Sequence, residues 1–127
     1  MSPKVTAVLE AISDDAALEL FRLVALTNGS SNTIRSNMNI TRKQYYSRLF
    51  KLVQYGLIKR NDNQYFLTTL GQVMYDAQAT IEKALQNYWK IKAIDSFDIN
   101  RNLPVEDRRR LIETLIKDQE LKSILVK

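Results

Sequence analysis

The chain has 127 residues, a formal charge of +5 and an ordinary globular composition, with 45% hydrophobic residues, no Cys and no His. The absence of Cys excludes disulfide scaffolds and thiolate metal sites, and without His or Cys the commonest catalytic side chains are missing. We therefore expect no enzymatic activity and no bound metal or cofactor. The longest apolar run, residues 20–26, is interrupted by Arg22 and is far shorter than the roughly 20 residues of a membrane span. No apolar signal region follows residues 1–4, so we expect a soluble cytoplasmic protein of one domain, with or without an appendage.

Three helices are expected before residue 40. Ser2-Pro3 is predicted to begin the first, in which apolar residues recur at helical spacing. Ser13-Asp14-Asp15 is predicted to begin the second, with its acids near the positive end of the helix dipole, and Asn28-Gly29 to end it. Ser31 is expected to cap a short third helix over residues 32–37.

A fourth helix and a hairpin are predicted next. The helix is expected over Arg42–Tyr55, with Thr41 as its cap and Gly56 at its end. Its buried face is predicted to hold Tyr45, Leu49, Leu52 and Val53. Residues 57–60 and 64–67 are predicted to form a short two-stranded hairpin around the turn residues Asn61-Asp62-Asn63.

Positive charge is concentrated around this fourth helix. Residues 34–60, here called the basic segment, carry +7, because they contain seven bases and no acid: Arg35, Arg42, Lys43, Arg48, Lys51, Lys59 and Arg60. Residues 1–33, 61–100 and 101–127 carry −2, −2 and +2. A segment of one sign is what binding to phosphates requires, so nucleic acid is the expected partner.

A long helix is predicted over residues 69–94, followed by a polar linker at 95–102. Its apolar residues follow alternating steps of four and three, a heptad seam typical of coiled coils: Leu70, Met74, Ala77, Ile81, Ala84, Tyr88 and Ile91. Tail helices are expected within 104–127, the last of them capped by Asp118. We therefore predict a head at 1–68 and a helical dimerisation region at 69–127.

This order of elements resembles a winged helix-turn-helix domain. Residues 40–49, with Leu52 and Gly56-Leu57-Ile58, are similar to its recognition helix and first wing strand. Residues 65–71 are similar to the closing strand and next helix start of MarR-like and ArnR-like archaeal and bacterial regulators, although the wing is shorter than in typical MarR-like proteins. The resemblance covers about residues 13–71. It implies a mostly α fold with a small β-wing, and a transcription regulator that binds double-stranded DNA as a homodimer.

The candidate DNA-binding residues lie on the predicted recognition helix, the turn before it and the wing. Near the helix N-terminus, Gln44 is a candidate for adenine, Arg42 or Lys43 for guanine, and Tyr46 for a thymine methyl group or a phosphate. Arg48 and Lys51 are expected at phosphates. The wing residues either contact DNA or form a basic edge strand that prevents aggregation. The full set is Arg35, Ser36, Asn37, Arg42, Lys43, Gln44, Tyr46, Ser47, Arg48, Lys51, Lys59, Arg60 and Asn63.

Several aromatic and basic residues have other interpretations. Tyr45 is expected in the core, whereas Phe50 points outward and covers either the wing or a partner chain. Tyr88 and Trp89 are interpreted as packing in the dimer seam rather than as a ligand pocket. The sequence does not indicate whether a small-molecule effector binds. The basic run at 108–110 is interpreted as solvated pairs with nearby acids.

Two alternatives to a sequence-specific regulator stay open. The first is an architectural or basal-machinery DNA-binding protein with little sequence preference, which would differ in its specificity ratio against random duplex. The second is a winged helix used only for protein interaction, in which the outward face of helix 42–55 should be acidic or apolar rather than basic. For either DNA-binding function we expect a cytoplasmic, nucleoid-associated protein.

Overall fold

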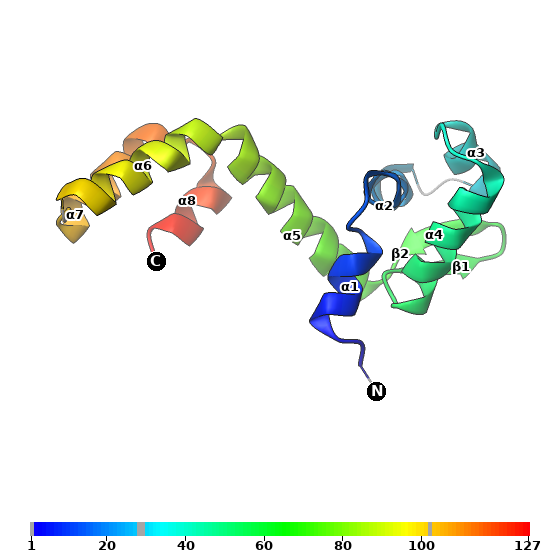
Figure 1. Cartoon of the computed structure of the whole chain (residues 1–127). Coiled ribbons are helices and arrows are strands. Elements are labelled where there is room, and N and C mark those ends of the chain that lie inside the picture. Colours follow the sequence, from blue (N-terminus) through cyan, green and yellow to red (C-terminus); the bar gives the residue numbers. More distant parts are fainter. Residues whose placement is uncertain (1, 28–29, 102) are drawn as a thin grey trace. The chain divides into compact units, whose positions relative to one another are not determined.

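The computed structural model describes residues 2–27, 30–101 and 103–127, which are mostly helical with one small antiparallel sheet (Figure 1). The chain divides into two compact units, Met1–Tyr75 and Asp76–Lys127. The expected mostly α fold with a small β hairpin is confirmed. The division between the two units falls inside a helix, after Tyr75.

The first unit contains four helices, the hairpin and the start of a fifth helix. These are α1 (Val5–Ala11), α2 (Asp15–Thr27), α3 (Ser31–Ser36), α4 (Arg42–Gln54), β1 (Ile58–Asn61), β2 (Gln64–Leu67) and the first turns of α5 (Thr69–Gln86). The second unit contains the rest of α5, then α6 (Tyr88–Arg101), α7 (Val105–Leu115) and α8 (Gln119–Leu125). No helix in the described part of the chain is long and apolar enough to cross a membrane.

The core of the first unit forms where α2 and α4 pack against each other and against the hairpin. Leu20, Phe21 and Val24 of α2 are fully buried at helical spacing. Tyr45 is also fully buried, as predicted. Val53 is not part of this buried face, because it is 42% exposed; the prediction for this residue is wrong, and the buried face of α4 is narrower than expected.

Side-chain caps mark the starts of α2, α3 and α4, whereas α1 begins without one. Thr41 caps α4 as predicted, whereas the cap of α3 lies one residue before the predicted one. Asp14, within the predicted start at Ser13-Asp14-Asp15, caps α2 through a 2.8 Å hydrogen bond from the Ala17 N–H. Ser30, not Ser31, caps α3.

The first helix starts later than predicted, and the end of α2 lies beyond the described residues. α1 begins at Val5 after Lys4, because the Lys4 carbonyl accepts the first helical hydrogen bond, from the Val8 N–H at 3.1 Å. The prediction that Ser2-Pro3 begins the helix is therefore wrong. The expected end of α2 at Asn28-Gly29 falls on residues outside those described.

The hairpin is joined closely to the start of α5. β1 pairs with β2 in antiparallel register, with Ile58 opposite Leu67. The first strand begins at Ile58, one residue later than predicted. Leu57 lies just before β1, and its carbonyl oxygen accepts a hydrogen bond from the Thr68 N–H at 3.1 Å. A Cβ atom at Gly71 would collide with the same Leu57 oxygen, so this position requires glycine.

The prediction of one continuous helix over residues 69–94 is wrong, because this stretch contains α5 and part of α6. The helix is interrupted at Asn87, whose side-chain amide donates to the Lys83 carbonyl at 2.9 Å and so competes for the backbone acceptor. The predicted linker at 95–102 is also wrong, because α6 continues to Arg101. No Gly or Pro lies between Asn87 and Pro104, so no strong helix breaker occurs before Pro104.

The core of the second unit explains why the chain changes direction after α5. Ile94 of α6 is buried with Ile112 and Ile116 from α7 and the residue that follows it, and with Leu121 of α8. Figure 1 shows α7 alongside α6, in agreement with their contacts. Asp118 caps α8 as predicted, because its carboxylate accepts from the Leu121 N–H at 2.9 Å. Burial of this second core stabilises the bent arrangement over a straight helix.

Candidate nucleic-acid interface

α4 presents four faces, because successive residues turn by about 100° around a helix. The buried face contains Tyr45, Leu49 and Leu52. The outward face, on the opposite side, contains Lys43, Ser47, Phe50 and Gln54, and all four are exposed. The inner flank contains Gln44, Arg48 and Lys51, and the hairpin flank contains Arg42, Tyr46 and Val53.

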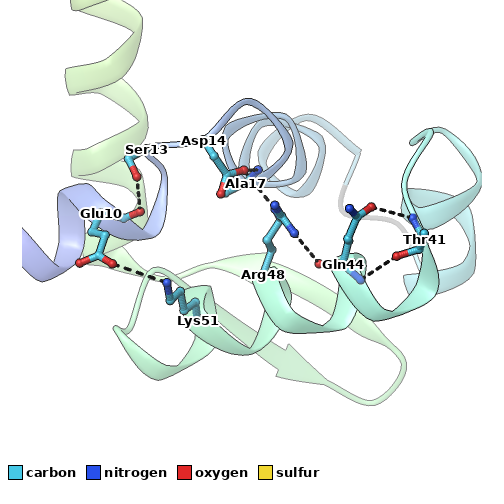
Figure 2. A network of polar contacts seen from close by, with 8 residues as sticks. All are labelled: Glu10, Ser13, Asp14, Ala17, Thr41, Gln44, Arg48 and Lys51. Atoms are coloured by element: carbon cyan, nitrogen blue, oxygen red, sulfur yellow. Dashed lines mark hydrogen bonds and ion pairs between the residues drawn. The ribbon is translucent and has the colours of Figure 1, made fainter.

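The basic residues of the inner flank contact acids of the same unit. Figure 2 shows Arg48 and Lys51 directed at α2 and α1. The Arg48 Nε atom lies 3.0 Å from the Asp14 Oδ1 atom, and the Lys51 Nζ atom lies 3.7 Å from the Glu10 Oε1 atom. Two of the seven bases of the basic segment thus have a carboxylate where a DNA phosphate was expected.

Asp14 has two roles at this flank. Its carboxylate accepts from the Ala17 N–H, which is the main reason why the pKa of Asp14 lies below its ordinary value, and Arg48 lowers the pKa further. Arg48 in turn donates from Nη1 to the Gln44 carbonyl at 3.3 Å. The carboxylate therefore holds both the start of α2 and the side chain of Arg48.

Gln44 is used locally at the start of α4. Its Oε1 atom accepts from the Thr41 N–H at 3.0 Å, while the Thr41 hydroxyl accepts from the Gln44 N–H at 3.1 Å. This reciprocal pair is a capping box. A bidentate pair with adenine needs the same oxygen as an acceptor, so reading of adenine by Gln44 would compete with the cap.

The hairpin flank is aromatic and apolar. The Tyr46 ring packs edge-on against Tyr45, with centroids 5.0 Å apart, and the Arg42 guanidinium lies 5.8 Å from the Tyr46 centroid. Beside it is a hollow of about 350 Å³ between α4 and the hairpin, lined by Tyr46, Leu49, Phe50, Val53, Arg60 and Tyr65. This hollow was not predicted, although the spacing of Tyr46, Phe50 and Val53 in the sequence indicates an apolar strip along the helix.

The other predicted DNA-binding residues lie before α4 and on the hairpin. Ser36 and Asn37, at the end of α3, both donate to the Thr33 carbonyl, at 2.9 and 3.1 Å, and Arg35 is half-buried beside them. On the hairpin, Lys59 and Asn63 are exposed, and Arg60 donates from Nε to the Asp62 carbonyl at 2.9 Å.

The predicted dimer seam is divided between internal packing and exposed surface. Met74 packs against the first core, and Ala84 and Ile91 pack against the second. The remaining seam residues are exposed in the single chain: Leu70, Ala77, Ile81 and Tyr88. Trp89, beside Tyr88, is 77% exposed.

Charged side chains in the second unit mainly attach α8 to its neighbours. The Lys83 Nζ atom lies 3.3 Å from carboxylate oxygens of both Asp118 and Glu120. Hydrogen bonds to Glu120 and then Asp118 raise the pKa of Lys83. Arg108, part of the basic run at 108–110, donates to the Leu125 carbonyl at 2.9 Å.

Comparison with protein-family models, with curated proteins and with solved structures finds no match for this chain. Within the described residues, no group of three or more His, Cys, Asp or Glu side chains is placed to hold a metal ion. A functional assignment therefore depends on the residues and geometry of the first unit.

Proposed function

We propose that the chain is a winged helix-turn-helix protein that binds double-stranded DNA with sequence preference and regulates transcription as a homodimer. The observation that carries this proposal is the exposed outward face of α4, with Lys43, Ser47 and Gln54, inside a segment of seven bases and no acids. A capped amphipathic helix followed directly by an antiparallel hairpin supports the same fold assignment.

In this proposal α4 enters the major groove with its N-terminal end first. Arg42 and Lys43, in the first turn, are then nearest to the base edges, where guanine offers two acceptors. Lys59 and Arg60 on the hairpin contact phosphates beside the groove. The capping box of Gln44 makes Lys43 the better candidate for reading bases.

Dimerisation is the second part of the proposal. Ile81 is 59% exposed and Leu85 is 63% exposed on α5, and Trp89 follows at the start of α6. Large apolar side chains that are exposed so close together in the sequence are typical of a surface that another chain covers. Sedimentation at micromolar concentration should therefore give about twice the chain mass of 14.7 kDa.

A charge in this surface should separate the dimer. Ile81→Asp places an unpaired carboxylate among apolar side chains, which costs several kcal/mol. Ile124→Asp is the matched control, because it introduces the same charge at an exposed isoleucine of α8, outside the proposed surface. A wild-type protein that sediments as a monomer would contradict the dimer and leave DNA binding by the first unit to be judged separately.

DNA binding is tested by selection from a random duplex library, followed by titration of wild type and Lys43→Ala. We expect one enriched motif, bound about 10³-fold or more tightly than random duplex, and a loss of about 1–3 kcal/mol for the variant on that motif alone. Binding without an enriched motif would favour an architectural protein. If the purified chain binds no duplex, the DNA-binding proposal is wrong.

A further inference from the structure

The hollow between α4 and the hairpin is apolar in a part of the chain that is otherwise basic. Phe50 is 67% exposed, Tyr46 is 43% exposed and Val53 is 42% exposed, so three neighbouring apolar side chains face solvent. Their positions recur every three or four residues along α4, and Arg60 and Tyr65 lie across from them on the hairpin. Such a cluster is unfavourable in water unless something covers it.

The charges around the hollow indicate what kind of molecule covers it. Arg42 lies over the Tyr46 ring, and Arg60 lines the opposite wall. The surrounding basic segment contains no acidic residue. A partner must therefore combine negative charge with an exposed apolar group, and it must approach the side of α4 that lies next to its outward face.

Duplex DNA has one base edge that meets this description. In the major groove three of the four bases present only hydrogen-bonding groups, whereas thymine also presents its C5 methyl group. The phosphates on either side supply the negative charge. A helix in the major groove with an apolar hollow on its flank is thus complementary to thymine.

We propose that this hollow selects thymine, with the C5 methyl group packed against Phe50 and Tyr46. This inference rests on the DNA-binding function proposed above and adds a residue that sets its specificity. Phe50 is the specificity residue, because its ring belongs to both the outward face and the hollow. Arg60, on the opposite wall of the hollow, holds a flanking phosphate and keeps the methyl group at the apolar wall.

The test compares two duplexes that differ only in methyl groups. One A·T-rich duplex of about 30 base pairs, long enough for two half-sites, is made with thymidine and again with deoxyuridine. Wild type, Phe50→Ala and Phe50→Leu are titrated against both. Leu26→Ala is the matched control, because Leu26 is an exposed apolar residue of the same unit on α2, with 71% exposure compared with 67% for Phe50.

Burial of one methyl group against water is worth about 0.8 kcal/mol, or about fourfold in affinity. Wild type and Leu26→Ala should therefore bind the thymidine duplex at least about fourfold more tightly than the deoxyuridine duplex. Phe50→Ala should bind both duplexes equally, at the wild-type affinity for the deoxyuridine duplex, and Phe50→Leu should retain part of the preference.

Four results would overturn the inference, and only the last of them also overturns the proposed function. Equal binding of both duplexes by wild type, or an unchanged preference in Phe50→Ala, leaves DNA binding intact and refutes selection by Phe50. If Phe50→Ala instead changes the sedimentation of the protein and not the preference, a second copy covers the hollow. If neither duplex binds to wild type, both proposals are wrong.

Discussion

The ion pairs on the inner flank of α4 determine how the protein should respond to salt when it binds DNA. Arg48 and Lys51 contact Asp14 and Glu10, as Figure 2 shows, so each base exchanges a carboxylate for a phosphate if it is to bind DNA. The double variant Glu10→Gln/Asp14→Asn removes both carboxylates and preserves the size of the side chains. Asparagine still caps α2, so the helix start is kept.

The size of the effect follows from the number of phosphates neutralised. If each wild-type head uses three or four bases, a dimer neutralises about 6–8 phosphates, and the slope of log K against log salt is about −5 to −7. Release of Arg48 and Lys51 adds up to two phosphates per head, which steepens the slope by up to about 3.6. Both pairs are at the surface and worth about 0–1 kcal/mol each, so the melting temperature should change little.

Fluorescence anisotropy of a labelled duplex at several KCl concentrations measures this slope. Asp15→Asn is the control for loss of a carboxylate next to this flank, because it removes one negative charge and neither of the contacts to Arg48 and Lys51. We expect the double variant to bind more tightly at low salt and to show the steeper slope, and the control to remain parallel to wild type. Parallel slopes for all three proteins would refute a phosphate role for Arg48 and Lys51, and a wild-type slope shallower than about −2 would show that the basic segment is not the DNA footprint.

Three further predictions concern stability. Gly71→Ala should lower the free energy of unfolding, measured in urea, by about 3 kcal/mol, because the new methyl group meets the Leu57 carbonyl. Gly56→Ala should lower it by only about 1 kcal/mol, because Gly56 has a φ of 78° but open space around the Cβ position. Equal losses for the two variants would contradict the close approach at Gly71. Because the pKa of Asp14 is lowered in the folded state, the carboxylate stabilises the fold at pH values above its unfolded-state pKa of 3.8, and this contribution is lost as the pH falls through the folded pKa. Between about pH 5 and 2 the free energy of unfolding should therefore fall less for Asp14→Asn than for wild type. Thr41→Ala should cost about 1 kcal/mol in thermal unfolding through loss of the α4 capping box, and an unchanged melting temperature would show that the cap is not needed.

Local signals predicted the parts of the fold that depend on near neighbours in the sequence. Thr41 and Asp118 cap their helices as expected, because the acceptor oxygen and the N–H that it binds are only three residues apart. Tyr45 was assigned to the core from its helical spacing alone, and it is fully buried. Most caps and helix faces are therefore readable from the sequence, whereas the cap of α3 and the outer edge of the α4 face, at Val53, are not.

Features that depend on distant residues were not predictable in this way. The heptad spacing through Asn87 indicated a continuous helix, yet Ala84 and Ile91 pack against tail residues that follow more than 20 positions later. The ion pair between Asp14 and Arg48 joins residues 34 apart, and no local pattern marks it. The ion pair arises from tertiary packing, and at Asn87 the packing of the second core adds to the local competition for the Lys83 carbonyl.

The attachment of α8 has a consequence for the order in which the second unit opens. Lys83 and Thr80 of α5 hold α8 through exposed contacts to Glu120, and salt weakens such ion pairs more than it weakens apolar packing. The helix has only seven residues, with Leu121 as its buried anchor. In hydrogen exchange the amides of α8 should therefore exchange first within this unit and speed up with added salt, while the buried backbone around Ile112 stays protected. We therefore expect α8 to detach from the rest of the unit as a separate step, and the fraction of molecules in which it is docked should depend on ionic strength.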